Sequence, residues 1–258
     1  ANALLIGYRR QDTLRVEGVS GVFYPFDNVF KGQGGKVSWA EAGLPEVYAE
    51  LMRYQIDVNK AIFHCDTAYM TYPLYFGGER IAGSFDHNVI VENKAAALYP
   101  KFESFNKQIK ISKIGEGIEY QGGFKLSGAS LYGYGEPGIP ARLTVYNNKR
   151  KRVFLGLGQQ FVIKREQSIV GEGIDAKLYI DADSLFHPSV GVRIDIPKQV
   201  INLNRGSKGN ERNPFYSSFY NMNLNTDNIA WHINRDSLEI GGGFATAKGV
   251  AQRVQFES

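Results

Sequence analysis

The sequence has very little cysteine and no long apolar run. Its 258 residues contain one cysteine, Cys65, which excludes an internal disulfide and any zinc site built from several cysteines. No stretch approaches the roughly 18 consecutive apolar residues of a membrane-spanning helix. The apolar fraction of 43% and the charged fraction of 22% exclude a disordered tail and a charged rod. We therefore expect a globular chain with a sizeable core.

Excess charge is also scarce, because the formal net charge is only +4. Residues 1–129 hold 14 basic and 14 acidic residues, whereas residues 130–258 hold 16 basic and 12 acidic residues. The tetrad Lys149-Arg150-Lys151-Arg152 accounts for that excess. Proteins that bind nucleic acid usually present a broad basic face. The composition of this chain therefore argues against a nucleic-acid partner.

Helix signal is scarce as well. The best candidate spans residues 39–51, but Gly43 and Pro45 interrupt it. At most it predicts one or two helical turns, with Val47 and Leu51 facing inward.

Strand signal is present along most of the chain. Tyr54–Val58, Ala141–Tyr146 and Val190–Ile196 alternate between apolar and polar residues, and Gly- or Asn-rich turns separate such runs. The pattern predicts an all-β, mainly antiparallel fold, either β-repeat or solenoid-like or a stacked β-sandwich, with at most one or two short helices. We expect a single elongated unit over residues 1–258, with a possible subdivision into 1–120 and 121–258.

A weak internal repeat is one interpretation of the β pattern. Five segments place a small residue and a hydroxyl residue inside a β run, and their hydroxyl residues are Ser20, Thr67, Ser130, Ser184 and Ser237. In three segments Asp precedes the hydroxyl residue. Spacings near fifty residues are typical of stacked β units, and chance similarity among strands is the alternative.

The basic tetrad lies between two strand-like runs. Residues 143–155 therefore predict a β-hairpin with Lys149, Arg150, Lys151 and Arg152 at its tip. Such a tip can contact phosphate, an anionic lipid headgroup or an acidic partner. The alternative is an ordinary solvated turn.

An aromatic and polar stretch follows residue 213. Its aromatic residues are Phe215, Tyr216, Phe219 and Tyr220, and Asn and Ser flank them. Aromatic rings in this setting can stack on sugars, or they can close one end of a β core. Both interpretations stay open at this point.

Residues that could carry metal or covalent chemistry are few. Asp181 and Asp183 form an Asp-x-Asp motif, but a hard cation needs about six oxygen ligands, and a solvent-facing pair on one strand is the alternative. His187-Pro188 indicates a strand edge or a turn. A metal site shared by His64 and His232 would need the five segments to stack. Cys65 is either a small buried hydrophobe or a nucleophile paired with a histidine.

Catalytic motifs are absent from the sequence, which lacks Gly-x-Ser-x-Gly and His-Glu-x-x-His. We predict no cofactor and favour a protein that is not an enzyme. A glycoside- or phosphoester-active enzyme using Asp181 and Asp183 is the least favoured hypothesis.

Several segments resemble parts of very large, repetitive, β-rich proteins of the Gram-negative cell envelope. The similar stretches are residues 39–51, 81–86, 99–105, 120–124, 181–188 and 213–222. The resemblance implies export to the periplasm, outer membrane or cell surface, and it supplies no catalytic residue. It also implies that the partners are the remainder of a longer chain or other envelope proteins. The start of the sequence lacks Met and a typical secretion signal, which favours a processed or partial chain.

Together these observations favour a structural, non-catalytic β segment of an exported envelope protein. The main alternative is a β module that binds a glycan or a lipid through the four aromatic residues or the basic tetrad.

Overall fold

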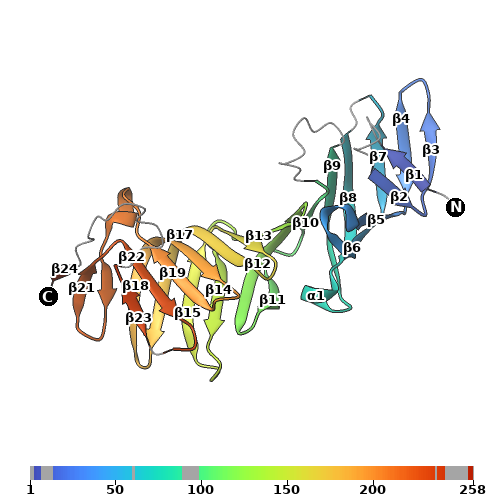
Figure 1. The fold of residues 1–258 in the computed structure, drawn as a ribbon. Coiled ribbons are helices and arrows are strands. Elements are labelled where there is room, and N and C mark those ends of the chain that lie inside the picture. The colour runs from blue at the N-terminus through green and yellow to red at the C-terminus, as the bar shows by residue number, and fades with distance from the viewer. Residues whose placement is uncertain are drawn as a thin grey trace. The chain divides into compact units, whose positions relative to one another are not determined.

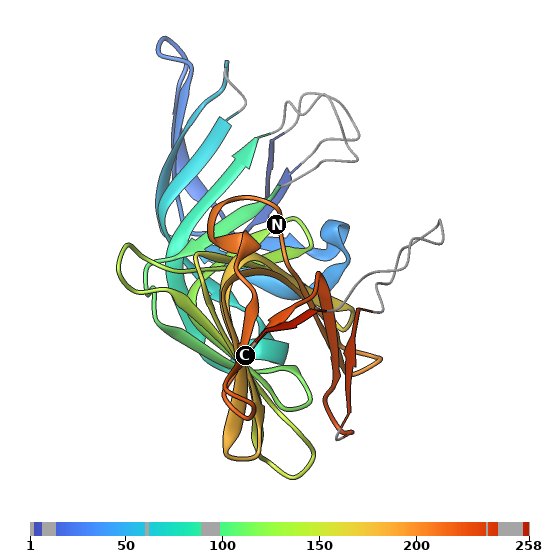
Figure 2. The same ribbon diagram turned by 90° about the vertical axis from the view of Figure 1, so that its left-hand side faces the viewer.

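The computed structural model describes residues 3–6, 14–59, 62–88, 99–235, 237–241 and 255–257. Within these residues, helical structure is limited to α1 (Pro73–Phe76) and two 3-10 turns at Ala40–Ala42 and Gly209–Arg212. The other regular elements are β-strands, and their pairings are antiparallel (Figures 1 and 2). None of the described helices combines the length and apolarity needed to cross a membrane. The predicted all-β, antiparallel class is confirmed.

The chain folds into two compact units. Unit 1 comprises Ala1–Lys107 and Gly123–Tyr132, and unit 2 comprises Gln108–Gly122 and Gly133–Ser258. Because the chain leaves unit 1 and later returns to it, no single cut in the sequence separates the two units.

Unit 1 consists of bent antiparallel strands. Its strands are β1 (Ala3–Ile6), β2 (Leu14–Glu17), β3 (Ser20–Tyr24), β4 (Val29–Gln33), β5 (Lys36–Trp39), β6 (Leu44–Leu51), β7 (Arg53–Asp57), β8 (Ile62–Thr71), β9 (Arg80–Asn88), β10 (Lys101–Ser104), the second half of β12 (Ile118–Ser127) and the start of β13 (Ser130–Tyr134). The first part of β8 pairs with β7 and its last part with β6, while β9 pairs with both parts of β8. In the same way, β4 pairs with β7 and β5 with β6. Neighbouring short strands are therefore the two halves of longer strands that bend.

Glycine makes one of these bends possible. Gly34 and Gly35 join β4 to β5 with φ values of 71° and 119°. A Cβ atom on Gly35 would lie 2.6 Å from Cγ1 of Val16, so the site excludes a side chain as well as requiring an unusual backbone. The bend lets both halves of the strand turn their apolar face toward the same core.

An aromatic cluster fills part of the core of unit 1. The ring centroid of Phe85 lies 5.3 Å from that of Phe63 and 5.9 Å from that of Trp39. Tyr54 follows at 4.7 Å from Phe63, and all four residues are buried. Burial also raises the pKa of Tyr54 to about 12. At roughly 1.5–3 kcal/mol for each fully buried large apolar side chain, this cluster is a main source of stability.

Unit 2 contains two series of strands. Besides the first half of β12 and the end of β13, its strands are β11 (Ile109–Gly115), β14 (Ala141–Tyr146), β15 (Arg152–Gly158), β16 (Gln160–Lys164), β17 (Ser168–Ile180), β18 (Asp183–Asp195), β19 (Val200–Asn204), β20 (Phe215–Ser217), β21 (Met222–Asn225), β22 (Asn228–His232), β23 (Leu238–Ile240) and β24 (Gln255–Glu257). One series runs β14, β15, second half of β17, first half of β18, β20, β21. The other runs β16, first half of β17, second half of β18, β19, β22, β23.

The two series belong to the same sheet because β17 and β18 bend between them. The register of this pair shifts between Gly171 and Ile174 and again before Ala176, and Gly173 has a φ of 64°. Ile169 before the bend and Leu178 after it are both fully buried, so the two halves share one core. At one end of that core, the backbone N–H of Asn148 donates to Asn234 Oδ1 at 2.8 Å and connects the two series.

Of the one or two helical turns that residues 39–51 predict at most, the structure has one, and the helical placement of Val47 and Leu51 is wrong because both lie in a strand. A 3-10 turn covers Ala40–Ala42, and residues 44–51 form strand β6. β6 pairs with β5 on one side and β8 on the other, and Val47, Ala49 and Leu51 are buried in the alternation of a strand. Pairing on both sides outweighs the local helical preference.

The alignment of the five hydroxyl segments is also wrong. Ser20 begins β3 and Ser130 begins β13, but Thr67 lies at the bulge inside β8. Ser184 is the second residue of β18, and Ser237 precedes β23 outside any strand. Because the five residues occupy different places in their strands, their similarity reflects the common alternation of β sequences.

His187-Pro188 lies inside β18 and not at the strand edge or turn that was predicted. Opposite it, the register shifts between Ile174 and Ala176, so a bulge accommodates the residue without an N–H group. His187 is fully buried; its Nε2 donates to the carbonyl of Asn213 at 2.7 Å and its Nδ1 accepts from the N–H of Ser189 at 3.0 Å. Burial lowers its pKa, which favours the neutral ring.

Candidate functional site

The predicted basic hairpin is confirmed. Strands β14 and β15 pair with Tyr146 opposite Arg152, and the tip lies between them. The side chain of Asn147 organises this tip, since its Oδ1 accepts the backbone N–H groups of Lys149 and Lys151, each at 3.0 Å. Arg150 adopts a left-handed backbone with φ of 61°. Asn is favoured at the position that Asn147 occupies, because its side-chain oxygen can accept the hydrogen bonds of backbone N–H groups in the turn.

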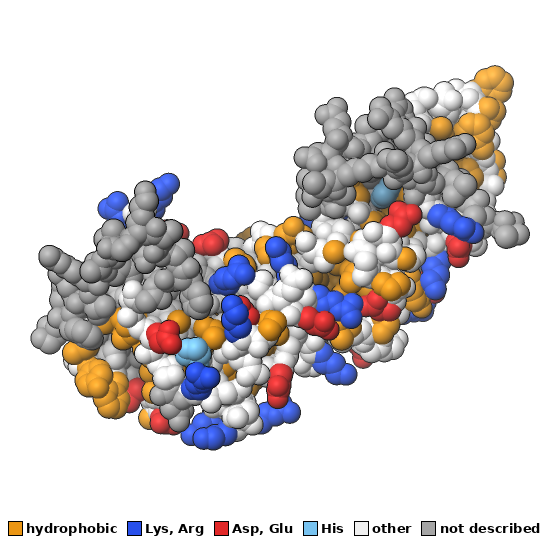
Figure 3. Space-filling model, in the orientation of Figure 1, with side chains coloured by type: hydrophobic (Ala, Val, Ile, Leu, Met, Phe, Trp, Pro, Cys, Tyr) orange, Lys and Arg blue, Asp and Glu red, His pale blue; other side chains and the backbone are white. Residues whose placement is uncertain are grey.

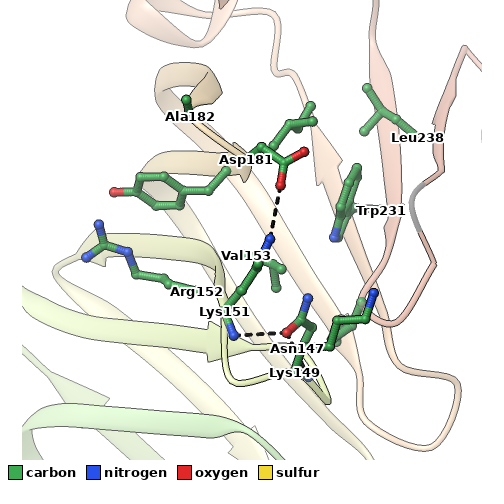
Figure 4. A pocket seen from close by; sticks show the side chains of 12 residues that line it. Asn147, Lys149, Lys151, Arg152, Val153, Asp181, Ala182, Trp231 and Leu238 are labelled. Atoms are coloured by element: carbon green, nitrogen blue, oxygen red, sulfur yellow. Dashed lines mark hydrogen bonds and ion pairs between the residues drawn. The ribbon is translucent and has the colours of Figure 1, made fainter.

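The cations of the tetrad have different surroundings. Lys151 Nζ lies 3.2 Å from Asp181 Oδ1, and the two side chains are 67% and 84% exposed (Figure 4). The guanidinium of Arg152 lies 4.3 Å from the ring centroid of Tyr179, a cation–π distance. The Lys151 side chain is therefore held by an exposed ion pair, while Arg152 packs on a ring of the neighbouring strand β17.

Asp181 and Asp183 do not form the solvent-facing pair on one strand that was the alternative to a metal site. Ile180 pairs with Asp183, so Asp181 and Ala182 make the two-residue turn between β17 and β18, with Asp181 at φ of 53°. Asp183 accepts a hydrogen bond from Ser218 Oγ at 3.0 Å, whereas Asp181 pairs with Lys151. The two carboxylates thus have separate partners. Among the described residues, no group of three or more His, Cys, Asp or Glu side chains could hold a metal ion.

The aromatic segment divides into one buried and three exposed residues. Phe215 is fully buried in β20, with its ring centroid 4.7 Å from that of His187, so it cannot contact a ligand. Tyr216, Phe219 and Tyr220 are 42%, 61% and 67% exposed. Phe219 and Tyr220 meet edge to face at 4.5 Å. Phe215 therefore closes the core as one interpretation predicted, while sugar stacking stays a prediction for the three exposed rings.

A pocket of about 830 Å³ opens beside the basic tip in unit 2. It is lined by Asn147, Lys149, Lys151, Arg152, Val153, Tyr179, Ile180, Asp181, Ala182, Trp231, Ile233 and Leu238. The pocket brings together the basic tetrad and Asp181, two motifs that the sequence treats separately (Figure 4). Sequence reasoning missed its far wall on β22 and β23, because nothing local connects Trp231 with a hairpin some eighty residues earlier.

The far wall carries one of five buried polar atoms without a partner among the described residues. Trp231 is only 5% exposed, and among the described residues its Nε1 has no hydrogen-bond partner. A buried donor without a partner costs about 1–3 kcal/mol, so it needs an explanation. Figure 4 shows the nitrogen end of the indole directed toward the tip of the β14–β15 hairpin.

The histidine and cysteine candidates have local partners. In unit 1, His64 Nδ1 lies 2.6 Å from Asp86 Oδ1, and that hydrogen bond raises its pKa. In unit 2, His232 Nε2 lies 3.0 Å from Glu239 Oε1. Cys65 is fully buried and donates to the carbonyl of Thr67 at 3.1 Å, and burial raises its pKa. The thiol thus lies in the core as a small buried group.

The second unusual surface is the edge strand β3 in unit 1. Within the described residues, β3 pairs only with β4, and all five of its residues are exposed. Val22 is 56% exposed and Phe23 50%, and Phe26 in the following turn is fully exposed. Figure 3 shows these apolar side chains as an orange patch over the β3–β4 hairpin.

Comparisons with known proteins give no guide to the role of either surface. No family model, curated protein or solved structure matches this chain. The pocket and the β3 edge are therefore the features that bear on function.

Proposed function

We propose that this chain is a structural, non-catalytic β segment of an exported cell-envelope protein. Its β3 edge would pair with a strand from a neighbouring segment of the same envelope protein. The observation that carries the proposal is that edge: an uncharged strand of sequence Ser-Gly-Val-Phe-Tyr, with every residue exposed, that pairs on one side only within the described residues.

An edge of this kind supports strand addition for a physical reason. An edge strand presents free N–H and C=O groups, and soluble proteins normally protect it with charge, proline or a bulge. β3 has none of these within Ser20–Tyr24, and its apolar side chains face water. Adding a strand would satisfy the backbone groups and cover Val22 and Phe23.

The chemistry-bearing residues of the core support a structural role as well. His187 connects the backbone of two segments, and the thiol of Cys65 donates to a backbone carbonyl. Burial raises the pKa of the Cys65 thiol and so disfavours the thiolate that a nucleophile needs, while backbone groups occupy both ring nitrogens of His187. Their roles are in packing and hydrogen bonding.

Site-specific photo-crosslinking in the native cell tests the proposal. A photoreactive phenylalanine analogue at position 23 is expected to crosslink to a β segment of the same protein in the envelope fraction. Phe105 in unit 1 is a matched control, because it is 53% exposed against 50% for Phe23. Equal crosslinking from both positions, or recovery of the protein in the cytosolic fraction, would contradict the proposal.

Glycan binding is the second candidate, and the exposed pair Phe219 and Tyr220 favours it. Exposed aromatic faces are the usual apolar platform for a sugar ring. On a glycan array, Tyr220→Ala should remove binding that the parent chain shows. Retained binding in that variant would count against a sugar platform at this turn.

A further inference from the structure

We propose that the pocket beside the β14–β15 tip binds an anionic amphiphile, a molecule with a phosphate- or carboxylate-type head and a hydrocarbon chain. The site goes beyond the structural role proposed above and does not depend on it. The pocket combines a cationic wall with an apolar one.

One wall is cationic. Lys149, Lys151 and Arg152 line the pocket, against the single carboxylate of Asp181. The Lys151–Asp181 ion pair is mostly exposed, and such pairs contribute little, so an incoming anion can compete for the ammonium group. Two flexible ammonium groups on one turn suit a compact anionic head.

The other wall is apolar. Val153, Trp231 and Ile233 are each 5% exposed or less, and Ile180 at 38% exposure extends this surface to the rim. At about 830 Å³ the pocket is far larger than an anionic head alone requires, and it falls in the usual range for ligand sites. A hydrocarbon chain on the head would cover the part of this wall that is still exposed, including Ile180.

The unpartnered Nε1 of Trp231 points to the same ligand. The atom lies in the apolar wall and is directed toward the basic tip (Figure 4). It is a donor only, so the group that would satisfy it is an acceptor oxygen. An anionic head held by Lys149 and Lys151 supplies such an oxygen at the boundary between the two walls.

The site is also preformed. Asn147 fixes the tip through two backbone N–H groups, and the N–H of Asn148 donates to Asn234 Oδ1 across the pocket end. Asn234 in turn donates to Gln199 Oε1 at 2.6 Å. A tip held on both sides loses little entropy when a ligand binds.

Fluorescence of Trp231 provides the test. The chain has two tryptophans, so Trp39→Phe leaves Trp231 as the single reporter. Dodecyl phosphate, titrated below its micelle concentration, should change the emission and saturate. Inorganic phosphate tests for an anion site alone, and dodecyl maltoside tests for an apolar site alone.

Variants assign the binding to the two walls. Lys149→Ala combined with Lys151→Ala should weaken dodecyl phosphate binding about tenfold, because two charge-assisted contacts are lost. Lys110→Ala combined with Lys164→Ala is the matched control, since both lysines are exposed in unit 2 outside the pocket, and it should bind like the parent. Ile180→Asn should weaken dodecyl phosphate binding and leave the melting temperature unchanged.

Three results would overturn the proposal. These are no saturable response to dodecyl phosphate, an equal response to inorganic phosphate or to dodecyl maltoside, and unchanged binding in the Lys149 and Lys151 double variant with its circular dichroism intact.

Discussion

The ammonium group of Lys151 lies 3.2 Å from the carboxylate of Asp181 and connects the turns of two hairpins, β14–β15 and β17–β18. The pair places the only basic tetrad of the sequence beside the Asp-x-Asp motif, at the mouth of a pocket whose far wall is Trp231. The position of this ion pair matters more than its strength, because both side chains remain largely in water.

The tip should depend on Asn147 far more than on this ion pair. Asn147→Ala removes the acceptor for two backbone N–H groups and should lower the free energy of unfolding by about 1–2 kcal/mol. Lys151→Ala should change it by less than about 1 kcal/mol, as exposed ion pairs do. Urea denaturation of the two variants gives the comparison, and an equal loss in both would be contrary to this account of the tip.

Unit 1 should lose stability in acid through His87. Burial lowers the pKa of His87 to about 4, and within the described residues its Nδ1 has no partner. An unfolded histidine takes up its proton near pH 6.5, so the unfolded state binds more protons as the pH falls, and stability present above pH 6.5 declines toward pH 4. At pH 4, His87 should lower the free energy of unfolding by about 3 kcal/mol relative to its value above pH 6.5.

Denaturation at pH 7 and pH 4 measures that effect. Between pH 7 and pH 4, the free energy of unfolding of His87→Phe should fall by about 3 kcal/mol less than that of the parent chain. His64 provides a control of opposite sign: Asp86 raises its pKa, so its contribution is present below pH 6.5 and lost as the pH rises through the folded value. His64→Gln should therefore remove stability at low pH. The same change in the free energy of unfolding between pH 7 and pH 4 in both variants would refute these assignments.

Gly83 in β9 should tolerate no side chain. A Cβ atom there would lie 2.2 Å from the carbonyl oxygen of Glu103 and 2.5 Å from Cζ of Phe102. Backbone cannot move aside cheaply, so Gly83→Ala should cost about 1–3 kcal/mol. Gly78 has nothing within 4 Å, and Gly78→Ala should be neutral or slightly stabilising in the same thermal melts.

Sequence reasoning succeeds where the signal is local. The alternation in residues 141–146 and the Asn147-Asn148 turn predict the β14–β15 hairpin, because both depend on neighbours a few residues apart. The same alternation, together with frequent glycine, gives the all-β class. The helical placement of Val47 and Leu51 is wrong because β6 forms by pairing with β5 and β8. Local preference does not describe such pairing.

The pocket shows the same limit. Its basic tip is visible in the sequence, whereas Trp231 reaches it only because β17 and β18 bend and carry β19 and β22 to the other side of the core. Register and bending are set by long-range pairing. Likewise, Phe215 and Phe219 look alike in sequence, and pairing of β20 with β18 buries only the first.

That difference between the two phenylalanines is measurable. Phe215→Ala should lower the free energy of unfolding by about 3–5 kcal/mol, because it leaves a cavity against His187. Phe219→Ala should change it by about 0.5 kcal/mol or less, since the ring is 61% exposed. Thermal or urea unfolding decides between them, and a large loss in Phe219→Ala would show that this turn is packed against something else.

The β3 edge should make the isolated chain associate with itself. Among the described residues only β4 pairs with β3, so the N–H and C=O groups on its other side and the exposed side chains of Val22 and Phe23 favour contact between two copies. Val22→Lys places a charge at the middle of the strand, and burying that charge in a second sheet would be costly.

Sedimentation velocity should therefore show concentration-dependent association in the parent chain and mostly monomer in Val22→Lys. Ile139→Lys is the control, because Ile139 is 51% exposed but belongs to unit 2 and not to the β3 strand, and it should associate like the parent. Association that persists in Val22→Lys would mean that another surface is responsible, and the strand-addition role of β3 would lose its basis.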